Sequence, residues 1–447
     1  MMFETLKNAF KTKEIRMKML FTFLLILVYR VGCFIPVPGF SASAMSSMLD
    51  QLGESADFIG ILSMITGGSL SQASLFSLGI LPFINAFIIM QLLTLIIPKL
   101  EKLSKEGDAG RRKITQITRY LALVLAAVQA IGVVVGWKTA VQPLFGFEES
   151  AETAYLTMTL IVIMLMGGSV MVMWLGERIT EYGVGNGTSL IIFVGILSTA
   201  GITIANAIAV ATGTPEYFWN IIGFILIVFA IFAFIVFMDL AERRVTVQYS
   251  KQIKGNKMYG GQTTYIPIRI NSSGVMPIIF ASSLLMFPQM IMALFAPNSD
   301  AYYWYSANMG TGTWVYYVLL AALILFFSYF YAQIQFNPED VAKNIQQYGG
   351  FIPGIRAGKP TSDYLKKISN RVTLFGAFFL MIIALIPTFV FNALSGDGST
   401  VLAGGGALQL GGAFSATGLL IVVSVALEFN KQLESQIMMK HYKGFLK

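Results

Sequence analysis

Apolar residues occur in long runs along this chain, and short polar segments separate the runs. Ten runs of roughly 18 to 25 residues are long enough to cross the ~30 Å hydrocarbon core of a bilayer as helices. A membrane barrel would instead show alternating segments of about ten residues. The pattern predicts an all-α membrane protein with ten transmembrane helices. The predicted spans lie near residues 19–36, 75–97, 120–137, 155–174, 188–211, 218–238, 274–295, 313–333, 372–391 and 414–429.

One apolar run is too short to cross. Residues 58–65 would form about 12 Å of helix at ~1.5 Å per residue, well below the thickness of a bilayer core. A Gly pair and a Ser/Gln-rich stretch follow, and Pro82 lies inside the next apolar run. The run is therefore expected to form only half a helix, which cannot cross the membrane.

Composition and charge agree with a multi-span protein and indicate its orientation. Of 447 residues, 55% are hydrophobic and 12% charged, about half the charged share of a soluble domain. Lys and Arg gather in the N-terminal segment, in the loops after spans two, six and eight, and in the tail at 430–447, whereas the opposite loops are acidic. Both termini are therefore predicted to be cytoplasmic. Residues 1–18 form a basic amphipathic pattern, expected to lie on anionic lipids of the inner leaflet.

A short pattern recurs in spans two and seven. Residues 79–84 and 274–279 each read Gly, two apolar residues, Pro, an apolar residue and Ile. If spans one to five and six to ten form two halves, 19–211 and 212–429, the odd number of spans in each gives the halves opposite orientations, as in inverted repeats that place a transport path at their interface. A chance match of Gly and Pro, which are both common in membrane helices, is the alternative.

Polar side chains follow or precede these two motifs. Asn85, Asn271 and Ser282 flank them, and Gln129 lies inside span three. Because polar groups in hydrocarbon need partners, we expect them to meet at a seam between spans two, three and seven. Ordinary interhelical hydrogen bonds without a gating role are the alternative.

The loops at about 239–270 and 334–371 are the sizeable polar parts of the chain, and both are basic. Gly and Pro around Arg356 would hold its guanidinium away from any helix, where it suits phosphate or carboxylate recognition. Such loops would meet an acidic protein surface or ribosomal RNA. Solvated loops that only set the topology are the alternative.

Signatures of several other protein classes are missing. The single histidine, His441, leaves neither a zinc site nor a Ser-His dyad, and the sequence has no phosphate-binding loop. No cofactor or enzymatic activity is therefore expected, and the single Cys33 excludes an internal disulfide. The spans hold almost no charges, which disfavours an ion-coupled transporter. Arg30 is the exception, expected either to extend toward the outer interface or to pair locally.

Six stretches together carry a family resemblance. The segments VGCFIPVPG (31–39), GGSLSQASLFSLGILPFI (67–84), EGDAGRRKITQITRY (106–120), ITEYGVGNGTSLIIF (179–193), NSSGVMPIIFASSLL (271–285) and GGFIPGIRAGKPT (349–361) resemble the SecY family of bacterial protein-conducting channel subunits. The resemblance runs along the whole chain in the family's order.

The resemblance assigns roles to specific positions. It implies a plug at about 58–74 that closes the channel from outside, a ring of mostly apolar side chains at the waist, and a lateral gate between spans two and seven. The implied plug residues are Phe58, Ile61, Leu62, Ile65, Gly67 and Gly68; the ring is Ile80, Ile84, Thr188, Ile192, Ile279 and Ile421; the gate is Asn85, Gln129, Asn271, Ser282 and Phe287.

The resemblance also implies partners and a location. The family's members pass unfolded polypeptides across the bacterial cytoplasmic membrane and release signal sequences and membrane segments into lipid. SecE and SecG are the implied membrane partners, and the SecA motor and the ribosome are the implied energy sources. The residues implied to dock these two are Arg243, Arg244, Lys251, Lys254, Lys257, Arg356 and Lys359.

Two other readings remain open from the residues alone. A secondary transporter of a small amphiphile would use residues 57–84 as a re-entrant substrate site, and would show solute-dependent flux. A non-conducting scaffold would only recruit ribosomes, and would not leak ions when the plug is deleted. The glycine-rich stretch 396–412 has no physical explanation in either reading or in the resemblance.

Overall fold

A computed structural model describes most of the chain. The described residues are 10–45, 66–136, 140–142, 151–213, 216–249, 252–254, 257–259, 263–271, 274–295, 299–310, 313–394 and 416–444. The predicted half-helix at 58–65 and the stretch 396–412 lie outside them. The chain divides into two compact units, unit 1 at Met1–Ile221, Met286–Thr311 and Ser395–Lys447, and unit 2 at Ile222–Leu285 and Gly312–Leu394. Each unit is described by itself.

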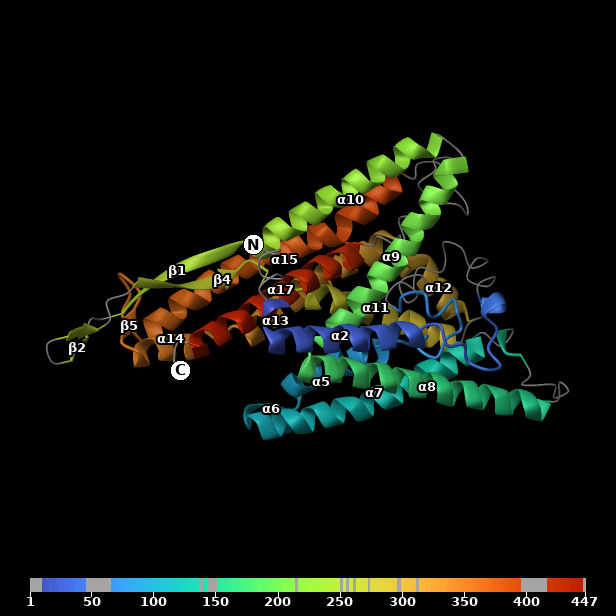
Figure 1. Cartoon of the computed structure of the whole chain (residues 1–447), viewed down its shortest axis with the longest axis horizontal. Coiled ribbons are helices and arrows are strands. Elements are labelled where there is room, and N and C mark those ends of the chain that lie inside the picture. Colours follow the sequence, from blue (N-terminus) through green and yellow to red (C-terminus); the bar gives the residue numbers. More distant parts are fainter. Residues whose placement is uncertain are drawn as a thin grey trace. The chain divides into compact units, whose positions relative to one another are not determined.

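Ten long helices coincide with the ten predicted spans, which confirms the helical reading of the membrane part (Figure 1). Among the described residues, four stretches are long and apolar enough to cross a bilayer by length and composition alone, or five if the bent pair Leu81–Thr94 and Pro98–Ser104 is one span; the four are Asp108–Val135, Ala154–Tyr182, Trp314–Gln347 and Lys359–Ile386. The helices are α2 (Lys13–Gly32), α5 (Leu81–Ile96), α7 (Asp108–Gly136), α8 (Ala151–Tyr182), α9 (Gly187–Gly213), α10 (Glu216–Leu240), α11 (Met276–Phe295), α13 (Trp314–Gln335), α15 (Lys359–Leu394) and α17 (Ala416–Gly444).

Span two begins later than its hydrophobicity predicts. Residues 75–80 form turns, and α5 starts at Leu81 with Pro82 in its first turn, where a missing N–H costs no intrahelical bond. At its other end Pro98 opens a short helix, α6 (Pro98–Lys105), and the two helices meet at a 104° bend. The helix formed by this apolar run is therefore shorter than the span predicted at 75–97.

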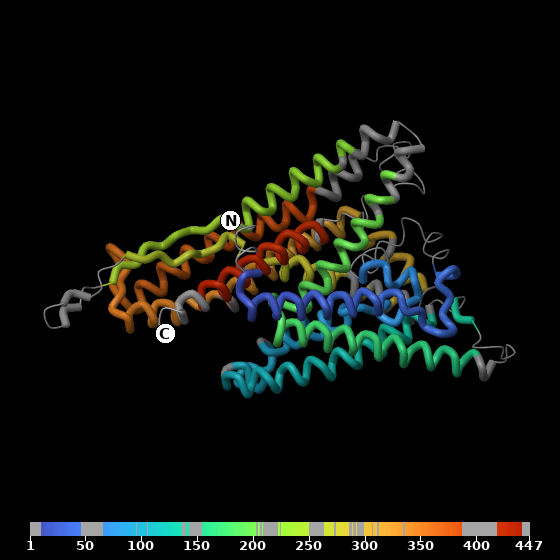
Figure 2. Tube along the Cα trace, in the orientation of Figure 1, coloured from blue at the N-terminus to red at the C-terminus, as the bar shows by residue number. Residues whose placement is uncertain are grey.

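Unit 1 is a helical assembly built around α5, α7, α8, α9 and α17. In it α5 packs on α7, α7 on α8, α8 on α9, and α9 on α17 (Figure 2). The turn between α8 and α9 is fixed to α2, because the backbone N–H of Val184 donates to Thr22 Oγ1 at 3.0 Å. The short helix α12 (Asp300–Met309) belongs to the same unit and is capped by Ser299.

Unit 2 contains a small sheet that the hydropathy pattern did not reveal. Strand β1 (Glu242–Tyr249) pairs antiparallel with β4 (Thr263–Arg269) in a register that sets Val245 opposite Ile266. Strand β5 (Gly350–Phe351) pairs with the other edge of β1, so residues from both predicted loops share one sheet. A two-stranded ribbon of β2 (Gln252–Lys254) and β3 (Lys257–Tyr259) lies between β1 and β4 in the chain.

The sheet has its own core. Val245 and Val247 on β1 and Ile268 on β4 are buried with Ile345 of α14 (Pro338–Gln347), Ile352 and Leu365 of α15. The two segments read as separate loops are thus one folded subdomain, defined here as the docking subdomain, residues 242–269 and 338–365.

Candidate functional site

Residues 66–80, which contain the last part of the predicted plug and continue to α5, form a compact loop held against the end of α2. The backbone N–H of Val37 donates to the Ala73 carbonyl at 3.0 Å, and that of Leu75 donates to the Ile35 carbonyl at 2.9 Å. Ala73 is fully buried with Leu78, in a core that includes Ile161 and Leu165 of α8. We call this segment the return loop.

Serine side chains satisfy the backbone of the return loop. Ser69 Oγ donates to the Phe76 carbonyl at 3.0 Å, and the Ser69 carbonyl accepts from Ser74 Oγ at 3.0 Å and Ser77 Oγ at 3.1 Å. All three serines are buried. Because buried carbonyls need partners, the Ser-rich composition allows an irregular segment to lie inside the protein.

Helix α2 contacts the start of the return loop through two consecutive side chains. Tyr29 Oη lies 3.5 Å from the Thr66 carbonyl, and Arg30 Nη1 donates to the Gly67 carbonyl at 3.3 Å. Arg30 also lies over the Phe34 ring, 5.3 Å from its centroid. The expectation that Arg30 pairs locally is confirmed.

The implied plug residues fall into two groups. Phe58, Ile61, Leu62 and Ile65 lie outside the described residues. Gly67 and Gly68 have φ values of +69° and +80°, which glycine adopts without strain. A Cβ atom built on Gly67 would lie 2.7 Å from Arg30 Nη1 and 3.0 Å from the Cα of Gly195 on α9, so the turn at this position is tightly enclosed.

Five of the six implied waist residues lie in unit 1. Ile80, Ile84, Ile192 and Ile421 are at most 8% exposed, and Thr188 is half-buried. Ile80 Cδ1 and the Thr188 backbone N both border Gly176 of α8, within 3.6 Å of a Cβ atom built there. The sixth, Ile279, is half-buried on α11 in unit 2. The loop and the first turn of α9 thus converge on one point of α8.

The implied gate residues have different surroundings. Asn85 is half-buried on α5, Gln129 is buried on α7, and these two helices pack together. Ser282 Oγ donates to the Ile279 carbonyl within its own helix at 3.0 Å. The backbone of Phe287 belongs to α11, and its side chain lies outside what the structure describes.

Asn271 is tied to the end of the preceding span. Its Nδ2 donates to Asp239 Oδ1 at 2.9 Å, and Asp239 belongs to α10. Its Oδ1 is buried and finds no hydrogen-bond partner among the described residues. Sequence reasoning missed Asp239, although a carboxylate at the end of an apolar run is a visible signal.

The implied docking residues cluster on one subdomain of unit 2. Arg243 and Arg244 are exposed on β1, and Arg244 bonds Glu242 at 2.8 Å and lies over the Tyr265 ring of β4 at 4.7 Å from its centroid. The pKa of Arg244 is raised by its hydrogen bond to Glu242, so it stays cationic. The backbones of Lys254 and Lys257 are paired in the register of the β2–β3 ribbon, and Lys251 lies outside the described residues.

Arg356 stands in a turn between Gly354 and Gly358, whose φ values are +80° and +97°. Thr361 Oγ1 donates to the Arg356 carbonyl at 2.8 Å, so the backbone is fixed while the guanidinium stays exposed. Lys359 is also exposed and begins α15. The predicted separation of Arg356 from regular helix is confirmed.

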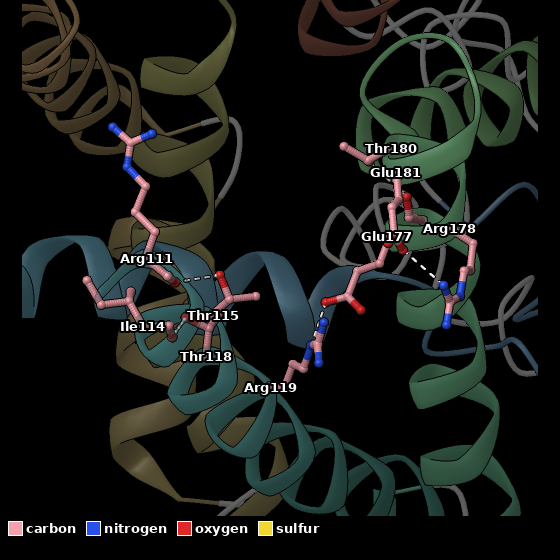
Figure 3. A network of polar contacts seen from close by, with 10 residues as sticks. Arg111, Ile114, Thr115, Thr118, Arg119, Glu177, Arg178, Thr180 and Glu181 are labelled. Atoms are coloured by element: carbon pink, nitrogen blue, oxygen red, sulfur yellow. Dashed lines mark hydrogen bonds and ion pairs between the residues drawn. The ribbon is translucent and has the colours of Figure 1, made fainter. Parts of the chain in front are cut away.

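A polar network joins α7 to α8 on the face predicted to be cytoplasmic (Figure 3). Arg119 Nε donates to Glu177 Oε1 at 2.7 Å, and Arg178 Nη1 donates to Glu181 Oε2 at 2.9 Å. Arg178 also lies 5.5 Å from the ring centroids of Trp174 and Tyr182. The first ion pair links α7 to α8, whereas the contacts of Arg178 lie within α8, and the sequence analysis predicted none of them.

Comparisons with known proteins agree on one family. A family model for SecY matches residues 74–430. A protein translocase subunit SecY of Streptomyces galbus is 42% identical over 450 residues, covering 98% of this chain and 99% of the relative. The corresponding subunit of Streptomyces griseus is 42% identical over 456 residues and covers both chains completely.

Solved structures share the fold. A protein-conducting channel superposes with a TM-score of 0.62 at 21% identity, covering 94% of this chain and 91% of the other. A SecY structure described in terms of a plug domain that stabilises the closed state and maintains a membrane seal gives 0.61 at 20% identity with the same coverage. Sec61 in a canine ribosome-channel complex gives 0.57 at 19% identity, again covering 94% and 91%.

Proposed function

The chain belongs to the SecY family, and from this premise we propose that it is the central subunit of a channel that passes unfolded secretory polypeptides across the cytoplasmic membrane. It also releases transmembrane segments sideways into lipid. The observation that carries the proposal is the 42% identity to translocase subunits over nearly the whole chain. The chain is a multi-pass membrane protein, and its basic loops and both termini face the cytoplasm.

The waist residues grip the passing chain. The ring contains four bulky apolar side chains, Ile80, Ile84, Ile192 and Ile421. Ile80 and the start of α9 both border Gly176 of α8. An apolar constriction excludes ions by dewetting and still deforms around a polypeptide of any sequence. Thr188 and Ile279 complete the ring, and Asn85, Gln129, Asn271, Ser282 and Phe287 line the lateral gate.

Photo-crosslinking tests this path. A photoreactive amino acid replaces Ile84, and a secretory chain is trapped halfway across vesicle membranes. Ile163 of α8 serves as the control because its side chain is 59% exposed on a predicted span. A crosslink to the passenger at Ile84 and none at Ile163 is expected. Translocation without any crosslink at Ile84 would place the path elsewhere.

Residues 58–74 act as the plug, and its removal should open the resting channel to ions. The described end of this segment, residues 66–74, supports the role because it is folded and anchored within the return loop, so residues 58–65 would have a fixed attachment. Deletion of residues 58–65 is expected to raise ion conductance of vesicles that contain the complex. Solute-dependent flux without a polypeptide would instead favour a small-molecule transporter.

The docking subdomain binds the partners that supply energy, because this chain has no nucleotide-binding loop of its own. SecA and the ribosome are the proposed partners, and SecE and SecG are the proposed membrane subunits. Exposed guanidinium groups at Arg243, Arg244 and Arg356 suit carboxylates and RNA phosphates. The chain itself is a conduit and catalyses no reaction.

Charge reversal at one position tests the docking surface. Arg356→Glu is expected to weaken binding of SecA or ribosomes about tenfold or more, because it replaces a cation at a fixed, exposed turn by a repelling anion. Lys366→Glu is the matched control, since Lys366 is an exposed cation on the neighbouring helix α15 and has no proposed role. Equal losses for both variants would indicate nonspecific electrostatics.

A further inference from the structure

Arg30 is a charged side chain inside a membrane span, and the proposed path gives it no role. It lies on α2, two residues before the helix ends at Gly32. A guanidinium in this setting is costly unless its donors find acceptors. The structure places it at the start of the return loop, against the Gly67 carbonyl and the Phe34 ring.

The acceptor is a main-chain atom in a turn that only glycine fits. Gly67 adopts φ of +69°, and a Cβ atom built on it would lie within 3.0 Å of both Arg30 Nη1 and the Cα of Gly195 on α9. The adjacent Thr66 is completely buried, and its carbonyl lies 3.5 Å from Tyr29 Oη. Two successive carbonyls are therefore held by two successive side chains of α2.

Other contacts keep these two side chains in place. The Tyr29 ring stacks on Phe76 at the far end of the return loop, with centroids 6.0 Å apart and planes 8° from parallel. The Arg30 guanidinium is oriented by Phe34. Consequently the position of residues 66–67 depends on α2, and not only on the serine bonds within the loop.

We propose that Arg30, together with Tyr29, is a latch that holds the base of the plug in the closed channel. The plug moves only when the Arg30–Gly67 and Tyr29–Thr66 contacts break. A hydrogen bond from a charged donor is stronger than a neutral one, so Arg30 contributes the larger part. Arg30 is thus a positioning residue, and the inference rests on the proposed plug function.

The latch is tested by the accessibility of the return loop. Thr66 is replaced by Cys in a Cys33→Ser background, and a membrane-impermeant maleimide is applied to vesicles that contain the complete complex. In the reference protein labelling is slow because residue 66 is buried. Arg30→Gln is expected to accelerate labelling about tenfold, the change that ~1.4 kcal/mol of lost hydrogen bonding produces. Ion conductance of the resting channel should rise in parallel.

Three further variants separate a latch from a general defect. Arg30→Lys keeps a cation and is expected to restore slow labelling in large part. Tyr29→Phe removes one hydroxyl and is expected to accelerate labelling less than Arg30→Gln does. Arg178→Gln is the matched control, because Arg178 also lies over aromatic rings of a spanning helix but is remote in sequence from the loop. It should leave both readouts unchanged.

The failure of the latch and the failure of the plug have different signatures. If deletion of residues 58–65 opens the channel but Arg30→Gln and Tyr29→Phe label at the reference rate, the latch is overturned and the plug stands. If the deletion leaves conductance unchanged, the plug proposal fails and the latch fails with it. Faster labelling of Arg30→Gln without any rise in conductance would also overturn the latch.

Discussion

The carbonyl group of Leu75 packs directly against Gly168, so the return loop and α8 meet backbone to backbone. A Cβ atom built on Gly168 would overlap this carbonyl, whereas one built on the neighbouring Gly167 would meet nothing within 4 Å. Ser169, the next residue, donates from its Oγ to the Gly79 carbonyl at 3.1 Å. One turn of α8 therefore fixes the loop that leads from the proposed plug to α5.

This contact predicts opposite effects for two adjacent glycines. Gly168→Ala should destabilise the protein by about 1 to 3 kcal/mol, because the backbone of the return loop must move to admit a methyl group. Gly167→Ala should be neutral or slightly stabilising, since alanine favours helix over glycine. Thermal unfolding of the two variants in the same detergent measures the difference. Equal melting temperatures would mean that the close approach is easily relieved.

The serine bonds of the return loop make a second prediction. Ser69→Ala should cost about 0.5 to 1.5 kcal/mol, because it removes one of two hydrogen bonds to the buried Phe76 carbonyl, which keeps the bond from the Gly79 N–H at 2.8 Å. Ser71→Ala removes a bond from Ser71 Oγ to the Gly68 carbonyl, but Ser71 is only half-buried and water can replace the donor. The free energy of unfolding should therefore fall less for Ser71→Ala. A larger loss at Ser71 than at Ser69 would contradict this account.

The docking subdomain yields a third prediction, because it has a hydrophobic core of its own to which the start of α15 contributes Leu365. Leu365 is fully buried among Val245, Val247 and Ile345, so Leu365→Ala should destabilise the subdomain by about 2 to 5 kcal/mol. Limited proteolysis should then cut residues 242–269 faster, and binding of SecA or ribosomes should weaken. Lys366→Ala, one residue away and exposed, should change neither readout. Unchanged proteolysis of Leu365→Ala would show that the strands do not depend on this core.

The spans were predictable because hydrocarbon imposes one strong requirement, a long apolar helix. The sequence was less informative wherever the chain leaves regular helix. The alternation of Val245 and Val247 with polar neighbours is a strand signal, but it is short and lies in a segment that its basic charge marks as a loop. Pairing of β1 with β5, more than 90 residues away in the chain, has no local signal at all.

The candidate site was likewise predictable from the sequence only in part. The resemblance supplied the waist, gate and docking positions, and the structure places Ile80 beside the start of α9 and puts Arg356 in an exposed turn. The roles of Ser69 and Gly168 depend on contacts between segments distant in the sequence. Such contacts arise from tertiary packing, and no periodic pattern records them.

The ion pair between α7 and α8 makes the last prediction. Arg119 and Glu177 are 2.7 Å apart, but their side chains remain 46% and 25% exposed, so water and salt screen the attraction. A double-mutant cycle of Arg119→Gln and Glu177→Gln should therefore give a coupling of only about 0.2 to 1 kcal/mol in unfolding free energy, smaller at high salt than at low salt. The pair aligns the ends of two spans more than it stabilises the fold. A coupling that stays above this range at high salt would show instead that the pair is shielded from water in the membrane.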